Sequence, residues 1–171
     1  MKQTPHARGF SLVEVLVALV IIGIGMLGIA KIQALAYAST GTSALRSLAA
    51  LQASSMASAM HANRNYWSVL PAAFSYQFTG TAAPVTTDAT LTGAGCTSAC
   101  AAGPLAAYDV QQWVVAVNAI LPNASGTISC PTNNPVSCMI QLTWGESNVA
   151  VNAQGAGNTM AAPTYTLYVV P

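Results

Sequence analysis

The sequence predicts an α+β protein, in which a long N-terminal helix is packed on a small antiparallel β-sheet domain that also holds a second helix. A helical pattern of apolar residues, uninterrupted by proline, runs from about Phe10 to Asn63. A second helical stripe and several segments of alternating polarity follow it. We therefore expect three parts: a leader at 1–9 that is cleaved, the long helix at 10–64, and a globular domain at 65–171.

The composition points to a membrane or an assembly rather than to an ordinary soluble surface. Hydrophobic residues make up 53% of the 171 residues, and charged residues only 5%. The net charge is +1 and the five Lys and Arg do not cluster, so we expect no nucleic-acid partner. Two segments, Ser68–Pro104 and Glu146–Pro163, are rich in Ala, Thr, Gly, Ser and Asn. We expect them to be water-facing loops with little core.

Phe10–Ala30 has the length and composition of a transmembrane helix. Its 21 residues would span about 31 Å, which matches the hydrocarbon core of a bilayer. Lys2 and Arg8 precede it without an acid, so the positive-inside rule keeps the N-terminus cytoplasmic and sends the rest across. Gly9, the plausible processing point, lies before the span, so cleavage there would keep the helix in the mature protein.

Glu14 is the one acid inside this span. An intramembrane carboxylate costs about 2.5 to 3.5 kcal/mol on insertion scales and is rare without a partner. The glutamate side chain is too short to reach far toward the headgroups. The sequence therefore predicts that Glu14 has a partner.

The globular domain is expected to contain one helix and three strands. The helix is predicted at Leu105–Leu121, where apolar residues recur at helical spacing. The strands are predicted at Gly126–Cys130, Ser137–Trp144 and Thr164–Val170. The aromatic residues of these elements are assigned to the core and the sheet rather than to a binding platform: Trp113, Trp144, Tyr165 and Tyr168.

Four cysteines, Cys96, Cys100, Cys130 and Cys138, would lie in an oxidising compartment, where thiols pair. Three connectivities are possible. The spacings C-x3-C and C-x7-C do not match the usual C-x2-C zinc pairs, so no metal is expected. We predict two local disulfides, Cys96–Cys100 and Cys130–Cys138, because each pair flanks a turn and closes a short loop.

The remaining acids do not form a catalytic pattern. Asp88, Asp109 and Glu146 are scattered, and the sequence has no Ser, His and Asp set and no phosphate-binding glycine loop. We expect no enzymatic activity and no cofactor.

Gly9 followed by FSLVEVLVALVIIGIGMLG resembles the class III signal of type IV pilin-like proteins. The resemblance implies cleavage after Gly9 by the prepilin peptidase and N-methylation of Phe10. It also implies that Glu14 neutralises the Phe10 amine of a neighbouring subunit. Lys31 departs from the family, because many major pilins carry a proline about there, and Gly23, Gly25 and Gly28 are the remaining weak points of the helix.

Three further stretches resemble minor pilins: MASAMHANRNYW, AAYDVQQWVVAVNAILPNASG and VSCMIQLTWGE. This resemblance implies a non-enzymatic subunit of the complex that primes pilus assembly and sits at the tip. Its partners would be other minor pilins, a tip adhesin, the prepilin peptidase and the inner-membrane assembly platform. It would cross the bacterial inner membrane once, and after assembly lie at the pilus tip, from the periplasm to the cell surface.

Two alternatives remain. A minor pseudopilin of type II secretion has the same leader, span and glutamate, although the cysteines and the Trp113 and Trp144 stretches favour the pilus. A membrane-anchored enzyme or binding module is disfavoured by the lack of convergent polar residues.

Overall fold

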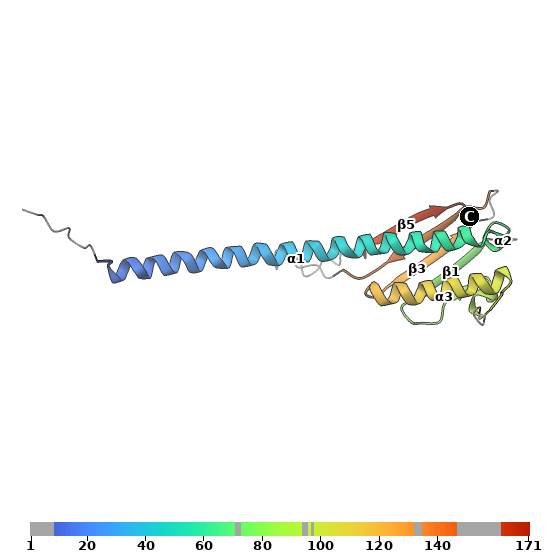
Figure 1. Cartoon of the computed structure of the whole chain (residues 1–171), viewed down its shortest axis with the longest axis horizontal. Coiled ribbons are helices and arrows are strands. Elements are labelled where there is room, and N and C mark those ends of the chain that lie inside the picture. Colours follow the sequence, from blue (N-terminus) through green and yellow to red (C-terminus); the bar gives the residue numbers. More distant parts are fainter. Residues whose placement is uncertain (1–8, 71–72, 94–95, 97, 132–134, 147–161) are drawn as a thin grey trace, which may run out of the picture. The chain divides into compact units, whose positions relative to one another are not determined.

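A computed structural model describes residues 9–70, 73–93, 96, 98–131, 135–146 and 162–171 (Figure 1). The chain divides into two compact units, Met1–Thr40 and Gly41–Pro171. Helix α1, Leu12–Ala62, contributes its first part to one unit and its second part to the other. Residues 1–8 of the predicted leader, with Lys2 and Arg8, lie outside the described residues.

The first unit contains the beginning of α1, which is helical at every residue from Leu12 through Lys31 and onward. No proline interrupts it, and the glycines at 23, 25 and 28 do not break it. Large apolar side chains on all sides of this part are exposed, for example Leu12 at 77% and Leu27 at 73%. The long helix was predicted correctly, although it begins at Leu12 and ends at Ala62.

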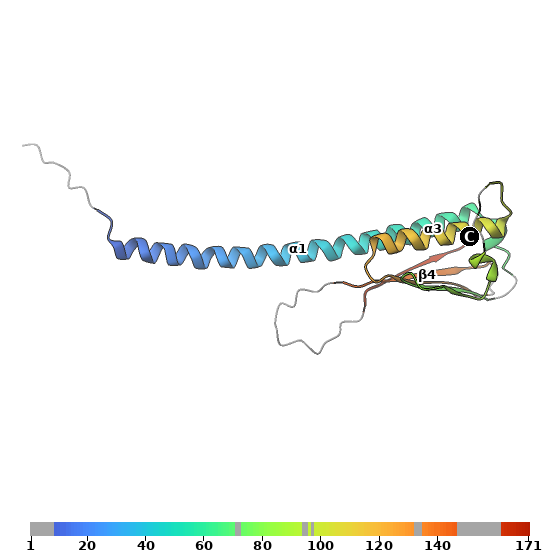
Figure 2. The same cartoon turned by 90° about the horizontal axis from the view of Figure 1, so that it is seen from below.

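The second unit contains a five-stranded antiparallel sheet of order β2-β1-β3-β4-β5. Its strands are β1, Phe74–Thr79; β2, Val85–Thr86; β3, Ser125–Cys130; β4, Cys138–Thr143; and β5, Thr164–Val169. The helices are the second part of α1, α2 at Arg64–Trp67, the 3-10 helix η1 at Ala89–Thr92, and α3 at Ala102–Ile120. Figures 1 and 2 show α1 and α3 together on one side of the sheet.

The core lies between these helices and one face of the sheet, because side chains of a strand alternate between faces. Every second residue of β1, β3 and β4 is buried, among them Phe78, Ile128 and Ile140. Gly126 of β3 gives Phe78 room, since an added Cβ would lie 2.5 Å from the Phe78 ring. The ring packs edge-to-face on Trp113 of α3, with centroids 5.5 Å apart. The opposite face carries Ser, Thr and Gln on the three central strands, with Met139 the exception.

The α+β prediction is confirmed, but Ser68–Pro104 is not the core-poor loop that its composition suggested. This segment contains β1, β2 and η1, and its Phe74, Tyr76 and Leu91 are buried. The second helix begins at Ala102 rather than Leu105, because a proline in the first turn, Pro104, needs no helical hydrogen bond there. Most of Glu146–Pro163 lies outside the described residues.

Candidate functional site

Gly9 and Phe10 lie in a short segment without regular structure that ends at Ser11, just before α1. Phe10 is 84% exposed, and an added Cβ at Gly9 would meet nothing within 4 Å. The Ser11 carbonyl accepts hydrogen bonds from the backbone N–H groups of Glu14, at 3.0 Å, and Val15, at 3.2 Å. Gly9 and Phe10 are therefore both exposed, and the helix begins two residues after Phe10, at Leu12.

Glu14 lies in this first helical turn and is exposed. A carboxylate near a helix N-terminus is favoured by the helix dipole, which compensates part of its charge. Among the described residues, the Glu14 side chain has no hydrogen-bond or ion-pair partner. The structure thus leaves the carboxylate four residues after Phe10 and available to a group from another molecule.

The first part of α1 forms an apolar surface around this acid. Among the described residues, α1 is the one helix long and apolar enough to cross a membrane by length and composition, and its most apolar window is not buried against the rest of the chain. Lys31 follows, exposed, one residue beyond the predicted span. The helix therefore offers lipid or neighbouring helices a continuous surface of Val, Leu and Ile.

Both predicted disulfides are present. Cys130 and Cys138 lie opposite each other at the ends of β3 and β4, with Cα atoms 4.1 Å apart, and both are buried. Cys96 and Cys100 close a short loop before α3, with Cα atoms 5.8 Å apart. The Cys130–Cys138 disulfide fixes the register of β3 and β4, while the Cys96–Cys100 disulfide constrains the segment that leads into α3.

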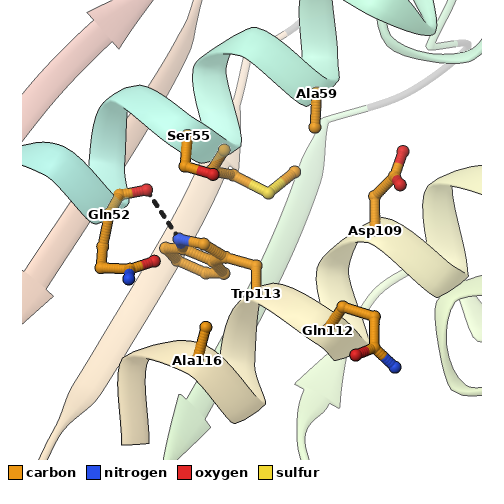
Figure 3. A pocket seen from close by; sticks show the side chains of 8 residues that line it. Gln52, Ser55, Ala59, Asp109, Gln112, Trp113 and Ala116 are labelled. Carbon is orange, nitrogen blue, oxygen red and sulfur yellow. Dashed lines mark hydrogen bonds between the residues drawn. The ribbon is translucent and has the colours of Figure 1, made fainter. Parts of the chain in front are cut away.

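Sequence reasoning missed a groove on the surface of the globular unit, between α1 and α3 (Figure 3). Its volume is about 390 Å³. Trp113 lies across it, and its indole N–H donates to the backbone carbonyl of Gln52 at 2.8 Å. Asp109 extends from α3 toward the part of α1 that carries Ala59. The groove is lined by Gln52, Ser55, Met56, Ala59, Asp109, Gln112, Trp113 and Ala116.

The other two acids of the globular unit are paired. Glu146, with a side chain only 5% exposed, accepts two hydrogen bonds from Arg46 of α1, at 3.1 and 3.2 Å, and one from the Trp144 indole N–H. Asp88 accepts from the Thr90 backbone N–H at 2.8 Å and from the Tyr66 hydroxyl at 2.5 Å. These hydrogen bonds, led by those from Thr90, hold the pKa of Asp88 below its ordinary value. Both pairs join distant segments of the fold.

Among the described residues, no group of three or more His, Cys, Asp and Glu side chains could hold a metal ion. Trp113 and Trp144 are core residues as predicted, and Tyr165 is partly buried on the sheet. Tyr168 also belongs to the sheet, but its side chain is 72% exposed.

Comparison with known families identifies the N-terminal segment. Residues 4–30 match the prokaryotic N-terminal methylation motif. No curated protein and no solved structure matches the chain. The motif, the apolar helix and the α+β architecture support a type IV pilin-like or pseudopilin-like protein, anchored in the membrane through its N-terminus.

Proposed function

We propose that this chain is a minor pilin of a type IV pilus, similar to the pilus modification protein PilV, and that it acts as a structural subunit rather than an enzyme. The observation that carries the proposal is the methylation motif over residues 4–30, which contains Gly9, Phe10 and Glu14 at the start of an apolar helix. A helix with one acid one turn from its mature end is suited to lateral assembly, because a carboxylate in lipid is unfavourable without a partner.

The three stretches that resemble minor pilins support the PilV-like assignment. MASAMHANRNYW forms the end of α1 and all of α2, and its Met56, Met60 and Trp67 are buried. The second stretch forms most of α3 and the turn into β3. VSCMIQLTWGE forms β4, with the disulfide at one end and the Trp144–Glu146 hydrogen bond just beyond the other. The resemblance thus covers residues that build the core of the globular unit.

In this proposal the leader is removed after Gly9 by the prepilin peptidase and Phe10 is methylated. The span at 10–30 holds the subunit in the inner membrane with its N-terminus cytoplasmic and residues 65–171 outside. The freed Phe10 amine of a neighbouring subunit then pairs with Glu14, because neither charge is tolerated alone in an apolar bundle. Other minor pilins, a tip adhesin and the assembly platform are the expected partners.

The same leader and span would serve a minor pseudopilin of type II secretion. The two disulfides and the Trp113 and Trp144 stretches favour the pilus. Neighbouring genes for other minor pilins and a large tip adhesin would support a pilus subunit, whereas a secretion operon would support the pseudopilin.

The test has two parts. Mass spectrometry should find a mature protein that begins with methylated Phe10, and a mature protein that still begins at Met1 would contradict the pilin assignment. Glu14→Ala should be cleaved at wild-type levels, because cleavage needs the leader and the residues at the cut. The variant should nonetheless co-purify with partner minor pilins more than a hundredfold less, since an unpaired buried amine costs about 3 to 5 kcal/mol.

Val15→Ala is the matched control, because it shortens the next side chain of the same exposed helix without removing a charge. It should be processed and assembled like the wild type. Normal co-purification of Glu14→Ala would show that this carboxylate is not the assembly contact.

A further inference from the structure

The groove between α1 and α3 exists because small side chains line the facing edges of the two helices. Ser55 and Ala59 of α1 lie opposite Ala116 of α3, where larger residues would close the gap. Met56 and Trp113 form an apolar floor, each 5% exposed or less. Residues of both helices thus combine to leave an open, partly apolar groove of about 390 Å³.

Asp109 is the acid of the described globular unit that has no partner. Asp88 and Glu146 each accept hydrogen bonds from side chains, whereas no hydrogen bond or ion pair reaches the Asp109 carboxylate from any described residue. The indole N–H of the adjacent Trp113 is already engaged by the Gln52 carbonyl. Asp109 is half-buried, and this burial raises the pKa of its carboxyl group above the ordinary value.

We infer that the groove receives a lysine or arginine side chain from a neighbouring pilin-like subunit, with the cationic group at Asp109 and the aliphatic stem along Trp113. This inference rests on the proposed function, because a subunit of an assembly has such neighbours. Charge complementarity identifies the occupant: a single uncompensated carboxylate attracts a cation. The side-chain amides of Gln52 and Gln112 can accept its remaining N–H groups.

The shape of the groove favours a basic side chain over a small free cation. Long basic side chains lay their methylene stems on apolar surface while the charged end reaches a polar site. A small ion would bind the Asp109 carboxylate without contacting the apolar floor. A basic side chain covers both, and it would relieve the desolvation of Asp109 by giving the carboxylate a charged donor.

The test uses the full-length chain, tagged and co-expressed in membranes with the other minor pilins of the same system. Asp109→Asn should reduce the co-purified partner at least tenfold, and Asp109→Glu should retain most of it. Gln112→Lys places an ammonium group one turn from Asp109 and should reduce the partner similarly, without unfolding the chain. Gln77→Lys, the same substitution at an exposed glutamine of β1, should leave the partner within twofold of wild type.

A photoreactive benzoylphenylalanine at Gln112 identifies the occupant directly. The cross-linked peptide should contain a lysine or arginine of another pilin-like subunit. Replacing that residue by aspartate should abolish capture, and combining it with Asp109→Lys should restore capture. Cross-links to a segment without a basic residue, or to this chain itself, would overturn the inference.

Glu14→Ala in the same assay separates the two proposals. If Glu14→Ala loses the partner while Asp109→Asn and Gln112→Lys retain it, the groove inference is wrong and the proposed function stands. If the wild type captures no pilin-like subunit, the proposed function itself fails and the groove inference fails with it.

Discussion

The two parts of α1 have the same backbone conformation and opposite environments. Up to Thr40 the helix exposes Val, Leu and Ile, with Ile24 67% exposed and Ile29 58% exposed. In the globular unit the same helix buries Ala49, Ala53 and Met60 completely. The first part carries large apolar residues on its exposed surface, whereas two of the positions buried in the second part, Ala49 and Ala53, carry small side chains beside Met60. The small side chains at Ala49 and Ala53, and not hydrophobicity alone, therefore distinguish these buried positions from the exposed first part.

The largest effect is expected from placing a large apolar side chain at one buried alanine of α1. Ala53→Leu forces three additional carbon atoms into a position that is 0% exposed, and overpacking of this kind destabilises by about 3 kcal/mol. Ala18→Leu makes the same change in the exposed first part of α1 and should leave stability unchanged. All three tryptophans lie in the globular unit, so denaturant unfolding followed by tryptophan fluorescence reports that unit. Equal midpoints for the two variants would contradict the comparison.

The next effect should come from the Cys130–Cys138 disulfide, which acts on the globular unit alone. Replacing both cysteines by serine frees a loop with a sequence separation of 8, which should cost roughly 2.5 kcal/mol in the chain-entropy model. Tryptophan fluorescence should show the loss, while far-UV circular dichroism of the first part of α1 should persist in detergent. Replacing Cys96 and Cys100 should cost less, because that loop is shorter.

Peptide mapping without reduction checks the pairing itself. The expected result is two linked peptides, one for each local pair. A peptide that joins Cys96 to Cys130 or Cys138 would refute the assignment.

Alanine substitutions at one glycine in each part of the molecule should change stability by a smaller amount. A Cβ at Gly126 would lie 2.5 Å from Phe78 and 2.9 Å from Leu142, so Gly126→Ala should destabilise the globular unit by about 1 to 2 kcal/mol. A Cβ at Gly25 would meet nothing within 4 Å. Gly25→Ala should therefore raise helix stability by about 1 kcal/mol through propensity alone. Opposite signs in thermal unfolding are expected, and a stabilising Gly126→Ala would show that Phe78 relocates freely.

Much of this fold was predictable because its signals are local. The apolar run with one acid identified the first part of α1, and the alternation in CMIQLT identified β4. The strand β1, FSYQFT, also alternates aromatic and polar residues. It was missed because the surrounding segment is rich in small polar residues, and the average composition masked a six-residue pattern.

The candidate site was predictable only where a single residue is energetically unfavourable in its local sequence. Glu14 signals its role because a carboxylate in an apolar helix requires an explanation. The Arg46–Glu146 pair joins residues 100 positions apart, and no local pattern links them. The groove depends on Ser55 and Ala116 being small at places that only the folded chain brings together. Contacts between elements that are distant in the sequence could not be predicted from the sequence alone.

The smallest expected effect concerns pH and contrasts two acids of the globular unit. Hydrogen bonds from Thr90 and Tyr66 lower the pKa of Asp88, whereas burial raises the pKa of Asp109. Because the folded pKa of Asp88 lies below its unfolded value of about 3.9, ionised Asp88 stabilises the fold above that pH. This contribution is lost as the pH falls through the depressed pKa. Asp109 has the opposite sign, so its contribution to stability increases as the pH falls.

Thermal unfolding between pH 7 and pH 3, followed by tryptophan fluorescence, separates these contributions. Asp88→Asn should lose less stability on acidification than the wild type, because the group that becomes protonated is gone. Tyr66→Phe should behave in the same direction, since removing the hydroxyl donor lets the pKa of Asp88 return toward its ordinary value. Asp109→Asn should lose more than the wild type, because it removes the acid that gains stability on protonation. Parallel pH profiles for Asp88→Asn and Asp109→Asn would mean that the hydrogen bonds to Asp88 do not stabilise its ionised form.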